Sequence, residues 1–137
     1  MRIALVFLSS LVLLGCSSEP IGIVRSQWNV INYWAIWCKP CREEIPELNQ
    51  LNRIENVVVL GVNFDGKVGE ALAADADELG ISFDIIGDPA SGLNITRPSV
   101  LPTTLVLSPE GTLAATLVGP QTAESIMAHI DRVKKPK

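Results

Sequence analysis

The sequence is short of basic residues and of histidine, and each shortage excludes or disfavours a class of function. Its 137 residues hold 11 Lys and Arg against 15 Asp and Glu, for a formal net charge of −4. Nucleic-acid binding is excluded, because it needs a basic surface that replaces the counterions on phosphate. The apolar content of 47% excludes low-complexity disorder. The length fits one domain with its own core.

Cysteine is also scarce, with three in the chain. An odd number in an exported protein means that one thiol has a role other than pairing within the chain. The three positions are Cys16, Cys38 and Cys41. The first stands far from the other two, so we consider it separately.

The N-terminus lacks an apolar run long enough to span a membrane. After Met1 and Arg2, an uncharged run extends from Ile3 to Leu14, well short of the roughly 20 residues of a spanning helix. Its length is typical of the core of a signal peptide. The run leads into Leu13-Leu14-Gly15-Cys16, which resembles the lipobox of bacterial lipoproteins.

The lipobox resemblance implies that residues 1–15 are removed and that Cys16 becomes a lipidated first residue. Its acyl chains would anchor the protein to a membrane of the bacterial cell envelope, with the domain in the periplasm or outside the cytoplasmic membrane. Residues 16–27 would form the lipidated N-terminus and a polar tether, and residues 28–137 the domain. An ordinary signal peptide followed by an unrelated cysteine is the alternative.

Apolar patterns predict alternating strands and helices in the domain. Buried strands are expected at 30–36 and 57–62. A helix follows each of them, and the second helix ends at Gly80. The first helix begins with Pro40, contains Pro46, and has an apolar stripe formed by Cys41, Ile45, Leu48 and Leu51. The remaining elements are a short strand at 83–86, a hairpin of strands at 105–107 and 113–118, and a helix that starts near Thr122.

This order of elements predicts an α/β fold. Helices between the early strands need parallel crossovers, while the hairpin adds antiparallel strands. We therefore expect one domain with a mixed central sheet flanked by helices on both faces. We also expect a monomer.

The motif Trp37-Cys38-Lys39-Pro40-Cys41 carries the chemistry. It lies where the first strand meets the first helix, so Cys38 faces unpaired backbone N–H groups and the positive end of the helix dipole. Both stabilise a thiolate, and Lys39 adds a nearby positive charge. Cys38 is thus the expected exposed nucleophile of disulfide exchange, and Cys41, one turn further on, resolves the mixed disulfide.

Two other interpretations of the cysteine pair are weaker. A structural disulfide between residues three apart closes almost no loop and would stabilise little. A zinc site needs four ligands, and beyond the pair the domain offers only carboxylates and His129 on the last helix. We expect neither a metal nor another bound cofactor.

Two segments of the chain resemble one known family. The segment from Asn32 to Leu48 is similar to the active-site segment of the TlpA/ResA-like branch of the thioredoxin superfamily. The segment from Leu101 to Gly111 is similar to the cis-proline loop and hairpin of that branch. The resemblance covers residues 28–135 and implies a thioredoxin-like fold. It places the TlpA-type insertion between Gly80 and Ser99.

The resemblance also implies how a client protein would be bound. Pro102 would be a cis-proline packed beside the dithiol, where it keeps metals away from the thiols. The backbone of Leu101 would pair with a strand of the substrate. Trp37 would shield the dithiol and form part of the substrate-facing surface, while Thr103 and Thr104 belong to the following strand.

Asn32 departs from thioredoxin itself, which has a buried aspartate at this position. Another group must then help to move the Cys41 proton. Glu44 matches an active-site glutamate of the ResA-like proteins and lies one helical turn after Cys41. The alternative for Glu44 is a solvated glutamate on the helix surface. Asp65, after the second strand, is interpreted as a loop residue.

Together these features predict a membrane-anchored, extracytoplasmic thiol-disulfide oxidoreductase that reduces disulfides of exported proteins. The resemblance suggests apocytochrome c as one substrate, and a membrane electron donor of the DsbD/CcdA type would re-reduce the pair. One alternative is a disulfide oxidant or isomerase with the same fold, since the residues between the cysteines tune the potential. A non-enzymatic lipoprotein adaptor is the other alternative.

Overall fold

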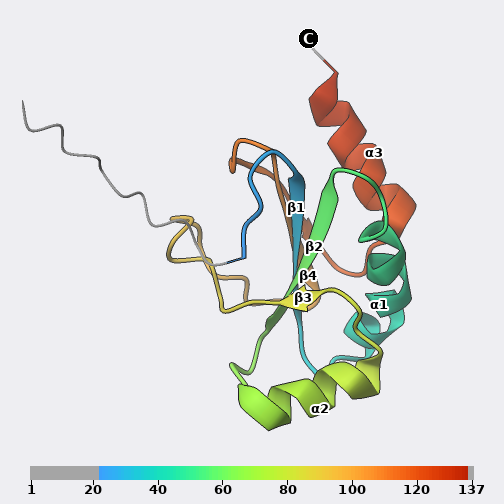
Figure 1. Ribbon diagram of the computed structural model, residues 1–137, viewed down its shortest axis with the longest axis vertical. Helices are drawn as coiled ribbons and strands as arrows, with labels where there is room; N and C mark the ends of the chain where they lie inside the picture. Colours follow the sequence, from blue (N-terminus) through green and yellow to red (C-terminus); the bar gives the residue numbers. More distant parts are fainter. Residues whose placement is uncertain (1–21, 136–137) are drawn as a thin grey trace, which may run out of the picture.

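The structure, a computed structural model, describes residues 22–135 (Figure 1). The predicted signal peptide, Cys16 and the first part of the predicted tether lie outside these residues. In chain order, the elements are β1 (Trp28–Trp34), α1 (Lys39–Leu51), β2 (Val57–Asn63), α2 (Gly69–Leu79), β3 (Asp84–Ile85), β4 (Thr103–Leu107), β5 (Leu113–Val118) and α3 (Ala123–Lys134). No helix within 22–135 is both long and apolar enough to cross a membrane.

One mixed sheet of five strands, in the order β3-β2-β1-β4-β5, forms the centre of the domain. The pairs β1–β2 and β2–β3 are parallel, whereas β1–β4 and β4–β5 are antiparallel. Asn32 of β1 lies between Gly61 of β2 and Thr104 of β4. The predicted mixed sheet with a C-terminal hairpin is therefore confirmed.

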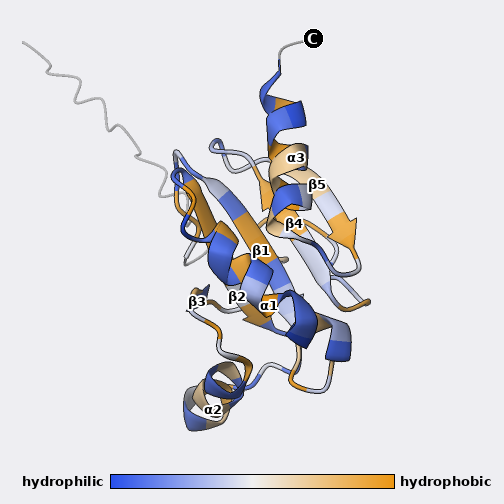
Figure 2. Ribbon diagram, turned by 90° about the vertical axis from the view of Figure 1, so that its right-hand side faces the viewer, coloured by the Kyte–Doolittle hydropathy of each residue, from blue (hydrophilic) through white to orange (hydrophobic). Residues whose placement is uncertain are grey.

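The two faces of the sheet are covered differently. Helices α1 and α3 lie on one face (Figures 1 and 2), over a core that includes Val30, Val59 and Val106. The other face is covered by irregular chain between β3 and β4, whose Ile86, Leu93 and Ile95 pack against the apolar side chains of the strands. Helix α2 lies beyond the end of the strands (Figure 1). Irregular chain thus takes the place of the helix expected on the second face.

Helix α1 forms where its sequence pattern predicts. Pro40 stands in the first turn, and the predicted apolar stripe is buried together with Glu44. Pro46 lies inside the helix. The stripe packs onto β1 and β2, which holds the first turn of the helix at the end of β1.

Helices α2 and α3 end and begin at the predicted signals. Gly80 follows α2 in the left-handed conformation, with φ 67°, which glycine adopts without strain. No residue of α2 is fully buried, because the helix lies past the sheet instead of on its face. Thr122 caps α3, and its side chain accepts a hydrogen bond from the Ser125 N–H.

Residues 22–27, in the predicted tether, contact the domain. The Ser26 N–H donates to the Pro109 carbonyl, 3.1 Å away. The Asn29 side chain exchanges two hydrogen bonds with the backbone of Val24. Ile23 packs on the sheet face away from α1. These contacts begin before β1 and fix the chain's approach to the sheet.

Candidate active site

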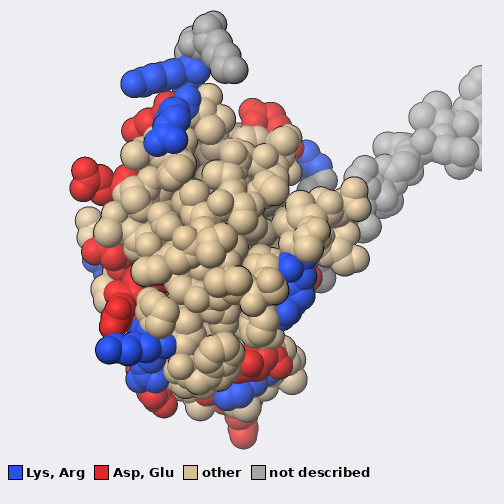
Figure 3. Space-filling model, turned by 180° about the vertical axis from the view of Figure 1, so that it is seen from behind, with Lys and Arg blue, Asp and Glu red and all other residues tan. Residues whose placement is uncertain are grey.

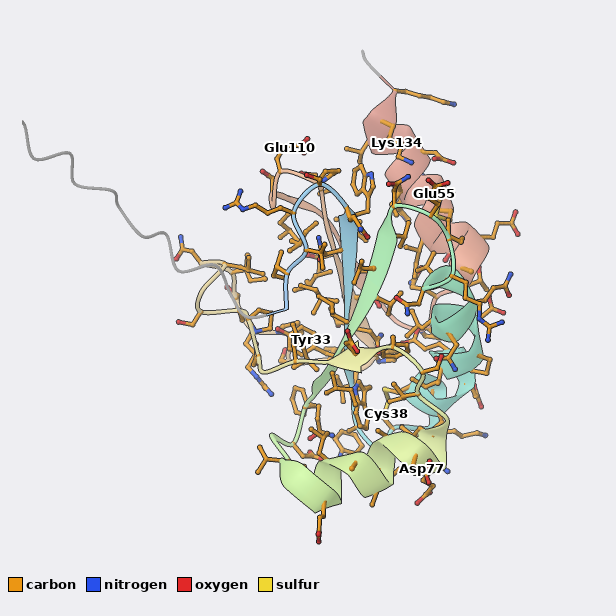
Figure 4. The ribbon with its side chains drawn as sticks, in the orientation of Figure 1. Tyr33, Cys38, Glu55, Asp77, Glu110 and Lys134 are labelled. Carbon is orange, nitrogen blue, oxygen red and sulfur yellow. A yellow bond between two sulfur atoms is a disulfide. The ribbon has the colours of Figure 1, made fainter. Side chains whose placement is uncertain are left out.

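The two cysteines of the motif are joined where β1 leads into α1. Cys38 and Cys41 form a disulfide with their Cα atoms 5.3 Å apart, at the same end of the sheet as α2 (Figure 4). Cys41 is fully buried, and Cys38 is 4% exposed. The sequence predicted an exposed first cysteine, so its coverage in the disulfide form is greater than expected. Cys38 remains the more accessible of the two cysteine residues.

Cys38 is the N-cap residue of α1. Its Sγ accepts a hydrogen bond from the Cys41 backbone N–H at 3.3 Å. The N-terminal end of a helix stabilises negative charge, so this position favours a Cys38 thiolate. Lys39 points into solvent, where its Nζ lies 3.9 Å from the Glu43 carboxylate. The helix terminus is thus the closer source of stabilisation.

The loop before β4 lies against the dithiol. The Leu101–Pro102 peptide bond is cis, as the family resemblance implied. Leu101 packs against the buried cluster that contains Cys38 and Cys41. The Pro102 carbonyl accepts a hydrogen bond from the Gly119 N–H at 2.9 Å, which ties this loop to the end of β5.

Glu44 lies inside the protein and is 2% exposed. The interpretation of Glu44 as a solvated surface residue is therefore wrong. Its Oε1 accepts a hydrogen bond from Asn32 Nδ2 at 2.6 Å, and its Oε2 accepts one from the Gln121 N–H at 2.9 Å. Burial raises the pKa of Glu44 above its ordinary value, although both hydrogen bonds act to lower it.

Asn32 links this carboxylate to the neighbouring strand. Its Nδ2 also donates to Thr104 Oγ1, 3.1 Å away. We call Asn32, Glu44 and Thr104 the carboxylate cluster; all three are buried. Asn32 Oδ1 has no hydrogen-bond partner among the described residues.

Trp37 forms the exposed surface beside the dithiol. Its side chain is 63% exposed, and its Nε1 donates to the two carboxylate oxygens of Asp65 at 3.0 and 3.2 Å. Its ring meets Phe64 edge to face, with centroids 6.5 Å apart. Asp65 stands in the turn after β2, as predicted, and there it also orients the tryptophan.

An arginine from the irregular segment between β3 and β4 packs against the Phe64 ring beside Trp37. The Arg97 guanidinium lies 4.2 Å from the centre of the Phe64 ring, and it donates to the Phe64 carbonyl at 2.7 Å and to Asp88 at 2.6 Å. Asp88 also accepts from the Tyr33 hydroxyl at 2.7 Å. We call Arg97, Asp88, Tyr33 and Phe64 the Arg97 network. It fastens the irregular segment to β1 and to the end of β2.

The Arg97 network perturbs both of its acidic groups. Burial, reinforced by Asp88, raises the pKa of Tyr33 well above its ordinary value. Burial alone would raise the pKa of Asp88, but hydrogen bonds from the Ala90 N–H, Tyr33 and Arg97 bring it below its usual range. Tyr33 is thus a neutral donor to a charged Asp88.

Sequence reasoning placed Cys38, Cys41, Glu44, Leu101 and Pro102 near one another, and the structure brings them to one end of the sheet. Sequence reasoning did not predict the partners of Glu44 or any contact of the Arg97 network. A signal existed for Asn32, because the alternation along β1 puts it on the face of Val30 and Trp34, toward α1. Thr104 and the Gln121 N–H had no comparable signal, since they come from distant parts of the chain.

The surroundings offer no metal centre in the part of the chain that the structure describes, where no three His, Cys, Asp or Glu residues are grouped to hold an ion. A cavity of about 460 Å³ lies between residues 95–100 and the hairpin of β4 and β5. The surface seen from the β5 side is broadly uncharged (Figure 3). Val100 and Thr103, which flank Leu101–Pro102, belong to the lining of this cavity.

Comparisons with known proteins agree with this geometry. Residues 21–116 match the model of the AhpC/TSA family. The chain is 32% identical to the thiol-disulfide oxidoreductase ResA of Geobacillus kaustophilus over 114 residues, which cover 80% of this chain and 65% of the relative. It is 31% identical to the thiol:disulfide interchange protein HelX of Rhodobacter capsulatus, over 74% of this chain and 58% of the relative. The chain thus spans less than two thirds of these relatives.

Solved structures share the fold. A DsbF homologue from Corynebacterium diphtheriae superposes with a TM-score of 0.68 at 27% identity, covering 79% of this chain and 73% of that one. StoA from Bacillus subtilis superposes with a TM-score of 0.63 at 21% identity, covering 77% of this chain and 84% of that one. The architecture is therefore thioredoxin-like.

Proposed function

The chain belongs to the AhpC/TSA family, and from this membership we propose that it is a thiol-disulfide oxidoreductase that reduces disulfides of exported proteins. The observation that carries the proposal is the Cys38–Cys41 disulfide at the start of α1, with Cys38 Sγ as the helix cap and Leu101 packed against it. Relatives named ResA and HelX carry the name of thiol-disulfide oxidoreductase or interchange protein, which supports the same chemistry here.

The cycle starts from the reduced pair. The Cys38 thiolate attacks one sulfur of a client disulfide, forms a mixed disulfide and releases the other client sulfur as a thiolate. Cys41 then gives its proton to the Glu44 carboxylate, and its sulfur attacks Cys38 Sγ. This second step breaks the bond between Cys38 and the client, so the client gains two electrons and the pair becomes a disulfide.

The residues around the pair would bind the client. Trp37 presents an exposed ring beside Cys38. Leu101, held before the cis bond to Pro102, offers backbone with which an extended client strand can pair. Apocytochrome c thiols are one client class that fits this scheme.

The location proposed is the cell envelope, with Cys16 lipidated after removal of residues 1–15. An extracytoplasmic reductase needs electrons from the membrane, so a donor of the DsbD/CcdA type would re-reduce Cys38–Cys41. Replacing Cys16 with alanine should abolish incorporation of labelled fatty acid and release the protein from membranes. Unchanged labelling in that variant would contradict the lipid anchor.

The activity is tested by insulin reduction with dithiothreitol as electron donor. The purified protein should accelerate precipitation of the reduced insulin chains, and Cys38→Ser should lose the acceleration completely. Equal activity of Cys38→Ser would refute the proposal. In cells, Cys41→Ser should accumulate mixed disulfides, and the proteins trapped in them would identify the clients.

The direction of electron flow is tested by a glutathione redox titration. A reductase should have a potential close to that of thioredoxin, about −270 mV, whereas an oxidant should lie near DsbA, about −120 mV. A value at the oxidising end would replace the reductase by a disulfide oxidant or isomerase. The cysteine chemistry would be the same in both cases.

A further inference from the structure

The carboxylate cluster contains an arrangement that the disulfide chemistry alone does not require. Asn32 Nδ2 donates both of its hydrogens, one to Glu44 Oε1 and one to Thr104 Oγ1. Its Oδ1 is left buried without a partner among the described residues. Turning the amide over would bring Oδ1 toward Glu44, where an ionised carboxylate has no hydrogen to give. The observed orientation therefore fits an ionised Glu44.

Both oxygens of Glu44 face donors. Asn32 Nδ2 lies 2.6 Å from Oε1, and the Gln121 N–H lies 2.9 Å from Oε2. A protonated Glu44 would point its own hydrogen at one of these donors, so the two contacts oppose protonation. The site is nevertheless buried, which opposes ionisation. The pKa of Glu44 thus depends on two opposing effects: burial favours the protonated form, and the hydrogen-bond donors favour the ionised form. Among the described contacts, Asn32 is the only side chain that donates to this carboxylate.

We propose that Asn32, held by Thr104, is a positioning residue that keeps Glu44 ionised and oriented to take the Cys41 proton in the resolving step. Cys41 and Glu44 stand one turn apart on the buried stripe of α1. Asn32 touches neither cysteine in the contacts described, and it acts only through the carboxylate. The inference rests on the proposed function, since it assigns Glu44 the role of proton acceptor.

No other charged group takes part in the contacts described for the cluster. The side-chain and backbone partners of Glu44 are Asn32 and Gln121, and the partner of Asn32 on the other side is the neutral hydroxyl of Thr104. Glu47, on the next turn of α1, accepts from the Ala123 N–H at the start of α3. A change in the pH dependence of Asn32 variants would therefore report on Glu44.

The resolving step can be measured directly. Reduced full-length protein is mixed with 5,5′-dithiobis(2-nitrobenzoate): attack by Cys38 releases one thionitrobenzoate, and attack by Cys41 on the resulting mixed disulfide releases the second. The rate of the second release is recorded by stopped flow across pH. Its acid limb should follow the ionisation of Glu44, the group that takes the Cys41 proton, and Glu44→Gln should flatten the limb.

Loss of the Asn32 donor should raise the pKa of Glu44, so the acid limb should move upward. We expect a shift of about one pH unit in Asn32→Ala, and a second release about tenfold slower on the acid side. At alkaline pH the rate should return to the parent value. Thr104→Val should move the limb in the same direction, whereas Thr104→Ser, which keeps the hydroxyl, should restore the parent profile.

Thr103→Val is the matched control, because it removes the same hydroxyl one residue earlier on β4. Thr103 bonds the Val100 carbonyl and not the cluster, so its limb should stay at the parent pH. An unshifted limb in both Asn32→Ala and Thr104→Val, with a flattened limb in Glu44→Gln, overturns the role of Asn32 alone. A limb that survives in Glu44→Gln overturns that role and the proposed role of Glu44 together. Neither outcome depends on insulin reduction, which tests the function separately.

Discussion

Replacing Gly61 with alanine should strain the packing directly behind the disulfide. Gly61 lies in the middle of β2, between β1 and β3. A Cβ added there would lie 2.9 Å from Trp34 Nε1 and 3.0 Å from Phe83 Cε2. Trp34 is fully buried and Phe83 is 6% exposed, so neither ring can swing into solvent. Trp34 also belongs to the cluster that contains both cysteines.

The magnitude follows from two opposing terms. Overpacking of this kind costs about 1–3 kcal/mol. Replacing glycine with alanine also restricts the unfolded chain, which stabilises the protein by about 0.4–1 kcal/mol. Gly87→Ala should be stabilised by the restriction of the unfolded chain and should carry no overpacking cost, because a Cβ there meets no heavy atom within 4 Å. The difference between the two variants therefore isolates the steric cost, at about 1–3 kcal/mol.

Urea unfolding of the oxidised protein measures this difference. Gly61→Ala should unfold at lower urea than Gly87→Ala with an unchanged slope. Its melting temperature should be lower by about 4 °C for each kcal/mol. Equal stability of the two variants, within about 0.5 kcal/mol, would refute the close packing of Gly61 against Trp34.

Three further predictions concern the charged groups and the last helix. Folding raises the pKa of Glu44. The free energy of unfolding should therefore fall as the pH rises from the pKa of an ordinary glutamate through the raised pKa of Glu44. Glu44→Gln should lack this fall in urea titrations across pH, and a retained fall would assign it to another group. Arg97→Gln should lose about 1–2 kcal/mol at neutral pH, and the loss should shrink as the pH drops through the lowered pKa of Asp88. A loss that is constant with pH would contradict the pairing with Asp88. Thr122→Ala should cost about 1 kcal/mol by removing the cap of α3, whereas Thr112→Ala, at an exposed turn position, should be nearly neutral in the same thermal melts.

The sequence predicted the parts of the fold that follow from periodic apolar residues. The stripe of α1 is buried as expected, because Cys41, Ile45 and Leu48 repeat at helical spacing. Glu44 lies on the same side of the helix, but hydropathy cannot predict its burial. Its carboxylate is stabilised by Asn32 and Gln121, which lie 12 and 77 residues away in the chain. Such partners become visible only when the elements are packed together.

The cover of the second sheet face was beyond prediction for a related reason. Between Gly87 and Ser99 the apolar side chains are isolated and show no repeat that marks a helix or strand, so the sequence predicted no regular element there. Their places are determined by the sheet face beneath them and by Arg97, whose bonds to Phe64 and Asp88 have no sequence motif. The cis bond before Pro102 was predicted from family resemblance and is present.

The irregular cover gives the domain two levels of stability. Helices α1 and α3 and the central strands share one continuous core, whereas the second face depends on scattered apolar contacts and on the Arg97 network. Chain without regular backbone hydrogen bonds can separate as a unit at a lower free energy than the whole domain. Opening of residues 86–97 would uncover Tyr33 and Leu105, whereas Cys41 and Glu44 belong to the buried stripe of α1. Backbone amides between 86 and 97 should then exchange with solvent long before those of β1, and α1 should keep Cys41 and Glu44 buried while this segment is open.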